Sequence, residues 1–339
     1  MENKKDMRTL IIAEAGVNHN GSLHKAKQLI DIAKFAGADI VKFQTFDPDK
    51  LVTKSASKAK YQKKYTKNQE TQYQMLKKLM LKPKEHKELI NYSKKRKIEF
   101  LSTAFDEQNL TMLLKLGIKR IKIPSGEINN RQLLIFAGKK KIPIILSTGM
   151  AYLHEVSEAL KVITKSGTPK SKITVLHCTS EYPAAFKNIN LLAMKSMQNK
   201  FNVSVGYSDH TLGSEVSIAA VALGARVIEK HFTISRKLIG PDHKSSLEPN
   251  ELKNLVNSIR NIEKSFGKEI KSPTQSEKKT KFIVRRSIVA LKLIRKGEIF
   301  TANNVGAKRP GTGISPMRIF KIIGKRAKHN FAKDQLIQE

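Results

Sequence analysis

The sequence predicts an α/β protein with a closed (β/α)₈ barrel followed by a small C-terminal unit. From Thr9 to about Phe266, short β-branched runs alternate with longer amphipathic stretches, as expected when helices join parallel strands. An open, doubly wound sheet would give the same alternation. Polar residues, however, follow the end of each apolar run. A barrel with one functional face requires polar residues at the strand ends, so a closed barrel is favoured over an open sheet.

Eight barrel strands are expected, each a short apolar run between longer segments. They are residues 10–13, 39–43, 99–102, 120–123, 143–146, 172–176, 203–206 and 226–229. The intervening segments have helical periodicity. In residues 23–35, for example, Ala26, Leu29, Ile30 and Ala33 recur at the spacing of one helix face.

The chain divides into a barrel domain at residues 1–266, a linker at 267–280 and a second domain at 281–339. The linker is rich in Lys, Ser, Thr and Gln, and apolar periodicity stops there. In the second domain, strands are expected at residues 287–293 and 297–300. Roughly 60 residues are marginal for an independent core, so this domain is expected to rest on a barrel or on a partner subunit.

The chain is strongly basic, with 64 Lys and Arg against 29 Asp and Glu and a net charge of +35. Such a charge is typical of proteins that bind nucleic acid. An inactive barrel that binds nucleic acid is therefore an alternative to an enzyme. The lysines are scattered along the whole chain, however, and no helix-turn-helix or zinc-finger spacing accompanies them. The excess is therefore attributed to solvated faces that also attract anionic substrates.

Neither a membrane span nor export is expected. No stretch approaches the ~20 apolar residues that cross a bilayer. The charged residues 1–8 lead directly into the apolar run that begins at Leu10, without the pattern of a secretory signal. The single cysteine, Cys178, excludes an intrachain disulfide. These features favour a cytoplasmic protein.

Charged and hydroxyl side chains gather at the expected strand ends. Lys42 and Lys122 alternate with apolar neighbours, which places both on the inner face of the barrel. With the hydroxyls of the neighbouring strands, two ammonium groups form a cradle for a phosphate or a carboxylate. Glu14 ends an apolar run, where burial would raise its pKa and suit it to proton transfer. Pairing of Glu14 with Lys42 is the structural alternative.

Two histidines, His210 and His231, follow adjacent strands and are expected to lie side by side. Such a pair could bind a divalent metal ion, with water and substrate completing the coordination. Hydrogen-bonding roles inside the barrel are the alternative. His24, His86, His154 and His329 lie in helical or charged contexts and are expected at the surface.

The ordered motifs resemble those of the sialic acid synthases, from about Leu10 to the C-terminus. They read AEAGVNHNG (13–21), VKFQTF (41–46), STAFD (102–106), KIPSGE (122–127), LSTGM (146–150), HCTSEYP (177–183), GYSDHT (206–211), EKHFT (229–233) and GPDHKSSLEP (240–249). KRPGTGISP (308–316) resembles the C-terminal SAF domain of these enzymes, an antifreeze-like β-clip fold. The resemblance implies a barrel with such a cap.

The resemblance also implies roles for individual residues. His210 and His231 match the two protein ligands of a divalent ion, usually Mn²⁺, with Mg²⁺ or Co²⁺ as alternatives. Phosphoenolpyruvate is expected to contact Lys42, Thr103, Lys122, Ser125, Ser147, Ser180 and Ser208, although Ser180 is asparagine in some members. Sugar contacts are expected from Gln44, Tyr182, Asp242 and Arg309. Glu14 is the expected proton-transfer residue, aided by Asp242.

The implied reaction joins phosphoenolpyruvate to an N-acylated mannosamine-type sugar and releases phosphate. A head-to-tail, domain-swapped homodimer is implied too, with Arg309 reaching the sugar from the partner chain. N-acetylmannosamine is the preferred acceptor, which makes the protein an N-acetylneuraminate synthase. A legionaminate synthase acting on 2,4-diacetamido-2,4,6-trideoxymannose is the main alternative, and pseudaminate chemistry is a weaker one.

Overall fold

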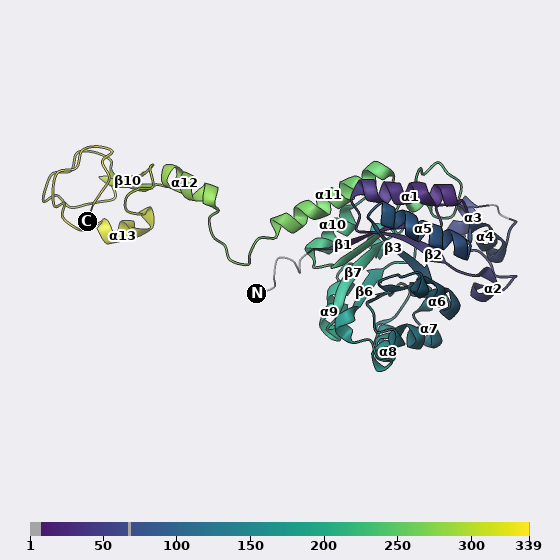
Figure 1. Ribbon diagram of the computed structural model, residues 1–339. Coiled ribbons are helices and arrows are strands. Elements are labelled where there is room, and N and C mark those ends of the chain that lie inside the picture. The colour runs from purple at the N-terminus through teal and green to yellow at the C-terminus, as the bar shows by residue number, and fades with distance from the viewer. Residues whose placement is uncertain (1–7, 67–68, 339) are drawn as a thin grey trace. The chain divides into compact units, whose positions relative to one another are not determined.

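The computed structural model describes residues 8–66 and 69–338. Eight parallel strands form a closed barrel in sequence order, which confirms the predicted (β/α)₈ architecture (Figure 1). The strands are β1 (Leu10–Gly16), β2 (Ile40–Thr45), β3 (Glu99–Ala104), β4 (Ile121–Ile123), β5 (Ile144–Ser147), β6 (Ile173–Cys178), β7 (Ser204–Asp209) and β8 (Val227–His231). Pairing of β1 with β8 closes the ring.

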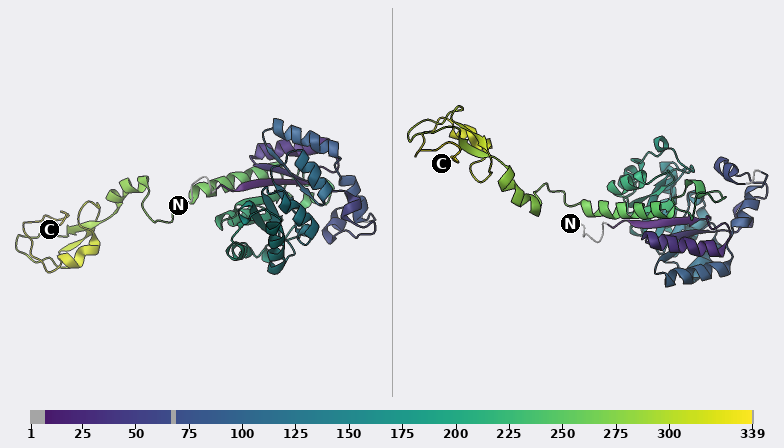
Figure 2. Two further views of the ribbon diagram at one scale, coloured as in Figure 1. Left: turned by 60° about the horizontal axis from the view of Figure 1, so that its bottom comes forward. Right: turned by 90° about the horizontal axis from the view of Figure 1, so that it is seen from above.

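Helices surround the strands, and α11 lies beside α1 where the ring closes (Figure 2). The barrel unit contains α1 (Leu23–Ala36), α2 (Pro48–Leu51), α3 (Lys60–Tyr65), α4 (Gln72–Leu79), α5 (Pro83–Lys95), α6 (Glu107–Lys115), α7 (Arg131–Lys139), α8 (Leu153–Lys165), α9 (Ala193–Phe201), α10 (Glu215–Ala222) and α11 (Pro249–Ser265). Four short 3₁₀ helices are described in it, η2 (Ser125–Glu127), η3 (Lys170–Lys172), η4 (Phe186–Asn188) and η5 (His243–Ser245). The connection from β2 to β3 is therefore unusual, because α2, α3 and α4 precede α5.

The barrel interior is built in layers, because every second residue of a strand points inward. An apolar layer fills the lower part and consists of Ile12, Ile40, Leu101, Ile145, Leu176 and Val227. Two residues further along the same strands, the inward positions become polar. They are Glu14, Lys42, Thr103, Ser147, Cys178 and Glu229. The apolar layer thus forms the floor beneath a polar mouth.

The chain divides into two compact units, one reaching to Phe266 and one beginning at Gly267. The second unit has its own apolar core, which includes Ile288, Ile294, Phe300 and Phe331. Its elements are α12 (Gln275–Val284), β9 (Ser287–Ala290), β10 (Val305–Lys308), η6 (Pro316–Arg318) and α13 (Ile319–Ile322), with β9 and β10 antiparallel.

The strands expected in the second unit are only partly present, because β9 ends at Ala290 and not at residue 293. Residues 297–300 form no strand, and only Ile299 makes an isolated bridge, to Arg326. Within the predicted linker, residues 267–280, α12 begins at Gln275. Thr274 caps this helix by accepting a hydrogen bond from the backbone of Glu277, while the Glu277 side chain accepts one from the Thr274 backbone. No helix within residues 8–66 and 69–338 is long and apolar enough to cross a membrane.

Candidate active site

The carboxyl ends of the barrel strands enclose a cavity of about 470 Å³. Twelve residues singled out by the sequence line it, and they come from all eight strands or the loops that follow them. They are Glu14, Lys42, Gln44, Thr103, Lys122, Ser125, Ser147, Ser180, Tyr182, Ser208, His210 and His231. The structure thus gathers most of the predicted site in one place.

Two predicted residues lie elsewhere. Asp242 lines a smaller side cavity of about 90 Å³, which shares Gln44, Tyr182 and His231 with the main cavity. Arg309 follows β10 in the second unit, so the barrel unit alone does not contain it.

Both lysines are buried among acidic and hydroxyl groups, as their alternation with apolar residues predicted. Lys42 Nζ lies 2.8 Å from Glu14 Oε2 and 3.6 Å from Glu229 Oε2. Lys122 Nζ lies 3.3 Å from Glu229 Oε1. Lys42 also donates a hydrogen bond to Thr103 Oγ1. Glu14 is therefore both the buried carboxylate and the partner of Lys42, the two roles that the sequence left as alternatives.

Glu229 was not among the predicted site residues, yet it connects the two lysines. Ser208 also donates a hydrogen bond to it, at 3.1 Å. The missed signal is its position in β8, two residues after the inward-facing Val227 and two before His231. Because every second residue of a strand points inward, this position places Glu229 in the polar layer of the barrel.

The two carboxylates have opposite pKa shifts. Burial raises the pKa of Glu14 to about 7, even though Lys42 favours the charged form. Burial also opposes ionisation of Glu229, but the charges of Lys122 and Lys42 prevail and hold its pKa at about 2. Glu229 is thus a permanent anion, whereas Glu14 can gain or lose a proton near neutral pH.

Hydroxyl groups complete the lysine end of the cavity. Lys122 donates a hydrogen bond to Ser147 Oγ at 2.8 Å. Gly149 N donates one to Ser125 Oγ at 2.9 Å. A Cβ atom on Gly149 would lie 2.3 Å from Ser180 Oγ and 2.9 Å from Ser125 Oγ. The absence of a side chain at residue 149 is therefore what lets these two serines approach the same point.

His210 and His231 lie side by side, with ring centroids 5.6 Å apart. His210 Nδ1 lies 2.6 Å from the Thr179 carbonyl oxygen, which fixes the ring. His231 Nδ1 is buried and has no hydrogen-bond partner among the residues described. Burial lowers the pKa of both histidines, and the nearby His210 adds to the effect at His231.

A pair of neutral imidazoles fits a divalent cation, because metal ligation needs unprotonated ring nitrogen. No group of three or more His, Cys, Asp or Glu suited to a metal occurs within residues 8–66 and 69–338. His210 and His231 could then be two of the ligands, and water and substrate oxygen would complete the coordination.

Aromatic rings surround the histidines. The Tyr182 ring lies 4.1 Å from that of His210, and Tyr61 of α3 stacks on Tyr182 at 4.8 Å between centroids. Nearby, burial raises the pKa of Asp242 to about 7. The histidine end of the cavity is thus more aromatic and less charged than the lysine end.

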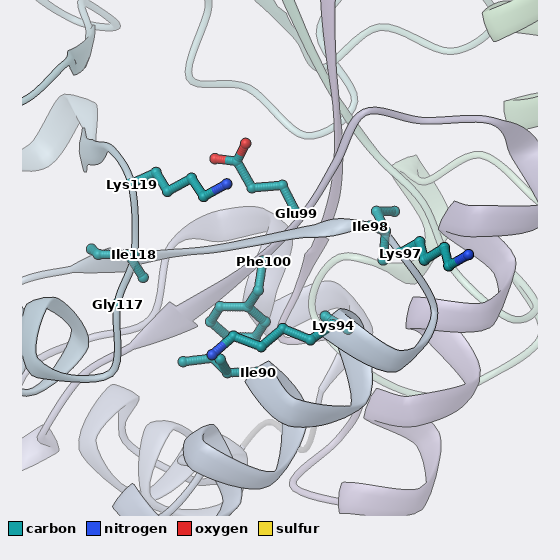
Figure 3. Close-up of a pocket in the computed structure, with 10 residues that line it drawn as sticks. Ile90, Lys94, Lys97, Ile98, Glu99, Phe100, Gly117, Ile118 and Lys119 are labelled. Atoms are coloured by element: carbon teal, nitrogen blue, oxygen red, sulfur yellow. The ribbon is translucent and has the colours of Figure 1, made fainter.

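Another cavity, of about 270 Å³, lies at the amino end of β3, beside α5 and the turn after α6. Its wall is mostly apolar, with Phe100, Ile90 and Ile118, and the ammonium group of Lys97 points away from it (Figure 3). None of the predicted site residues lines it. The candidate site is therefore the cavity at the carboxyl ends of the strands, where barrel enzymes have their active sites.

Comparison with known families agrees with this geometry. Residues 29–271 match the model of the NeuB family, and residues 285–339 match that of the SAF domain. The chain belongs to the NeuB family. The predicted resemblance to sialic acid synthases and the predicted SAF domain are thereby confirmed.

Similar proteins narrow the choice within the NeuB family. The chain is 54% identical to N,N'-diacetyllegionaminic acid synthase of Campylobacter jejuni, over 98% of this chain and 99% of that protein. It is 47% identical to the Legionella pneumophila protein of the same name, over 96% and 92%. A crystal structure of N-acetylneuraminic acid synthetase from Leptospira borgpetersenii is 36% identical, covers 80% of this chain and 90% of its own, and has a TM-score of 0.70.

These likenesses show that this NeuB protein is a synthase of sialic-acid-type carbohydrate biosynthesis. They favour the legionaminate alternative over the neuraminate activity that the sequence analysis preferred.

Proposed function

We propose that the protein is an N,N'-diacetyllegionaminic acid synthase, which joins phosphoenolpyruvate to 2,4-diacetamido-2,4,6-trideoxymannose and releases phosphate. Two relatives of that name, similar over nearly the whole chain, support this choice of sugar. N-acetylmannosamine, and with it neuraminate synthesis, becomes the second candidate.

The observation that carries the proposal is one cavity with two chemically different ends. At one end, Lys42, Lys122 and the serine hydroxyls offer positive charge and donors to a phosphate and a carboxylate. At the other end lie the histidine pair, Gln44 and Tyr182. Phosphoenolpyruvate fits the first end, and a polar sugar with an aldehyde fits the second.

The reaction follows from this arrangement. Carbon 3 of phosphoenolpyruvate forms a bond to the aldehyde carbon of the open-chain sugar, whose oxygen takes up a proton and becomes a hydroxyl. Water adds to carbon 2, and the bond from carbon 2 to the bridging oxygen breaks. Phosphate leaves with that oxygen, and carbon 2 becomes the ketone of the product.

The chain's own residues have distinct tasks in these steps. Lys42 and Lys122 neutralise the charges of phosphate and carboxylate, and Glu229 keeps both ammonium groups in place. Glu14, with a pKa of about 7, accepts the proton released by the added water. Asp242 and Gln44 orient the sugar hydroxyls. No Schiff base with either lysine is needed.

A divalent ion fits this scheme as a cofactor. His210 and His231 would hold it, with Mn²⁺ preferred and Mg²⁺ or Co²⁺ as alternatives, and it would supply Lewis acidity at the aldehyde oxygen. Arg309 is assigned to a partner copy in a domain-swapped homodimer, where it meets the sugar's acyl group. A cytoplasmic location stays a prediction.

The test uses metal-stripped protein with phosphoenolpyruvate labelled with ¹⁸O at the bridging oxygen. Each sugar is offered with Mn²⁺ and without it. We expect metal-dependent phosphate that carries the label, and a product with the mass of N,N'-diacetyllegionaminate. Unlabelled phosphate would contradict cleavage at carbon 2, and a lysine adduct trapped by borohydride would indicate an aldolase instead.

A further inference from the structure

The side cavity beside the histidines has a wall that the assigned site residues do not explain. It opens next to the main cavity, with which it shares Gln44, Tyr61, Gln62, Tyr182 and His231. Its remaining lining residues are Val17, Met75, Leu76, Leu79, Pro241 and Asp242. Lys122 and the four serines of the phosphate cradle do not line it. The side cavity therefore belongs to the sugar end of the site.

Part of the wall of the side cavity is apolar. Val17, Met75, Leu76 and Leu79 belong to one hydrophobic cluster with Phe46 and are at most 8% exposed. Polar groups line the rest of the cavity, among them Gln44, Gln62 and Asp242. A polar molecule with an apolar tip matches this distribution, because the tip avoids water and the rest keeps its hydrogen bonds.

The size of the side cavity limits what the tip can be. A dry cavity of about 150 Å³ in another protein accommodates a benzene ring. The side cavity has about 90 Å³ and therefore suits a methyl or acetyl group, not a ring. The two candidate sugars differ in this respect. The diacetamido sugar has a methyl group on its acetamide at carbon 4 and another at carbon 6, where N-acetylmannosamine has hydroxyls.

The wall of the side cavity is also held in place. Three of its four apolar residues lie on α4, which Thr71 caps while Gln74 returns a hydrogen bond. Just before α4, Glu70 pairs with Lys58 and Lys78. A wall fixed in this way can discriminate between substituents, because it does not collapse onto an empty space.

We propose that the side cavity receives a methyl group of the sugar acceptor that N-acetylmannosamine lacks, so that Met75, Leu76 and Leu79 set the choice between the two sugars. This inference rests on the proposed function, and it assigns sugar specificity to α4, outside the strand ends.

Two variants test the inference by opposite means. Met75→Gln keeps the size of the side chain but makes the wall polar, and Leu76→Phe fills the space. The selectivity is the ratio of kcat/KM for the diacetamido sugar to kcat/KM for N-acetylmannosamine. Each variant should lower it about tenfold or more, the usual effect of one methyl group in an apolar pocket. The KM for phosphoenolpyruvate should stay the same.

Leu51→Gln is the matched control, because Leu51 packs against the same cluster but lines neither cavity. It should leave the selectivity unchanged, and thermal unfolding checks that each variant is folded. If either folded variant keeps the selectivity of the unmodified protein, the inference is wrong, but the proposed function is not affected. If the unmodified protein turns over neither sugar, the proposed function itself fails.

Discussion

Glu14 and Glu229 are two buried carboxylates in one cavity, and their environments drive their pKa values apart. This separation assigns proton transfer to Glu14 and a constant counter-charge to Glu229. Glu14→Gln should therefore lower kcat at least about 100-fold, the usual loss for a general acid or base, and should leave Mn²⁺ binding intact. Steady-state kinetics and metal titration would measure the two effects.

The control is Glu99→Gln, because Glu99 lies at the amino end of β3 and pairs with Arg120. It should keep near-normal kcat. Near-normal kcat in Glu14→Gln would remove Glu14 from the mechanism.

Gly149 is a residue at which one methyl group should weaken anion binding. An alanine there would push against Ser180 and Ser125, two of the hydroxyls assigned to phosphoenolpyruvate. We expect the KM for phosphoenolpyruvate to rise about tenfold and the KM for the sugar to change little, which corresponds to about 1.4 kcal/mol.

Gly126→Ala is the matched control for Gly149→Ala. Gly126 also lines the main cavity, but a Cβ atom there would meet nothing within 4 Å. Equal KM values for phosphoenolpyruvate in the two variants would separate the serines from phosphate binding.

The loops after β1 and β8 predict how stability depends on pH. Burial lowers the pKa of His19 to about 3 and that of His243 to about 4. Both rings stay neutral in the fold, whereas in the unfolded chain they take up protons near pH 6.5. Their contribution to the free energy of unfolding is complete above that pH and decreases as the pH falls below it.

Urea unfolding at pH 7 and pH 5 measures this effect. Each buried histidine should lower the free energy of unfolding by about 2 kcal/mol between pH 7 and pH 5, because it takes up a proton only in the unfolded chain. His243→Gln should therefore make the stability less dependent on pH, whereas His154→Gln, at an exposed residue, should not. An unchanged pH dependence in His243→Gln would contradict the assignment.

Much of the barrel could be predicted from the sequence, because parallel strands between helices leave a strong local pattern. Local patterns do not predict contacts between residues that are far apart in the sequence. His86 was expected at the surface, yet it is buried and its Nε2 lies 2.7 Å from Thr45 Oγ1. The strand expected at residues 297–300 failed because the second unit has few regular pairings.

The candidate site shows the same division between local and distant information. Twelve of its members follow from strand ends and motifs, but the link that Glu229 makes between the lysines depends on three strands meeting. The wall that α4 gives to the side cavity depends on a helix inserted between β2 and β3. Neither contact is encoded in neighbouring residues.

The whole molecule has two units, and the proposed dimer predicts that a complete site needs residues from two chains. Glu14→Gln and Arg309→Ala should each be inactive alone. Refolded together, they should recover about a quarter of the normal activity, because half of the dimers are mixed and each mixed dimer has one intact site. Measured activity that does not rise on mixing would place Arg309 in its own chain's site or outside the site.

The proposed function is a reaction of the whole protein with one preferred sugar. The most direct measurement is a competition, in which equal concentrations of 2,4-diacetamido-2,4,6-trideoxymannose and N-acetylmannosamine meet the protein with phosphoenolpyruvate and Mn²⁺. Mass spectrometry then gives the ratio of the two products. We predict an excess of N,N'-diacetyllegionaminate of about tenfold or more. An excess of N-acetylneuraminate, or the absence of both products, would contradict the proposed function.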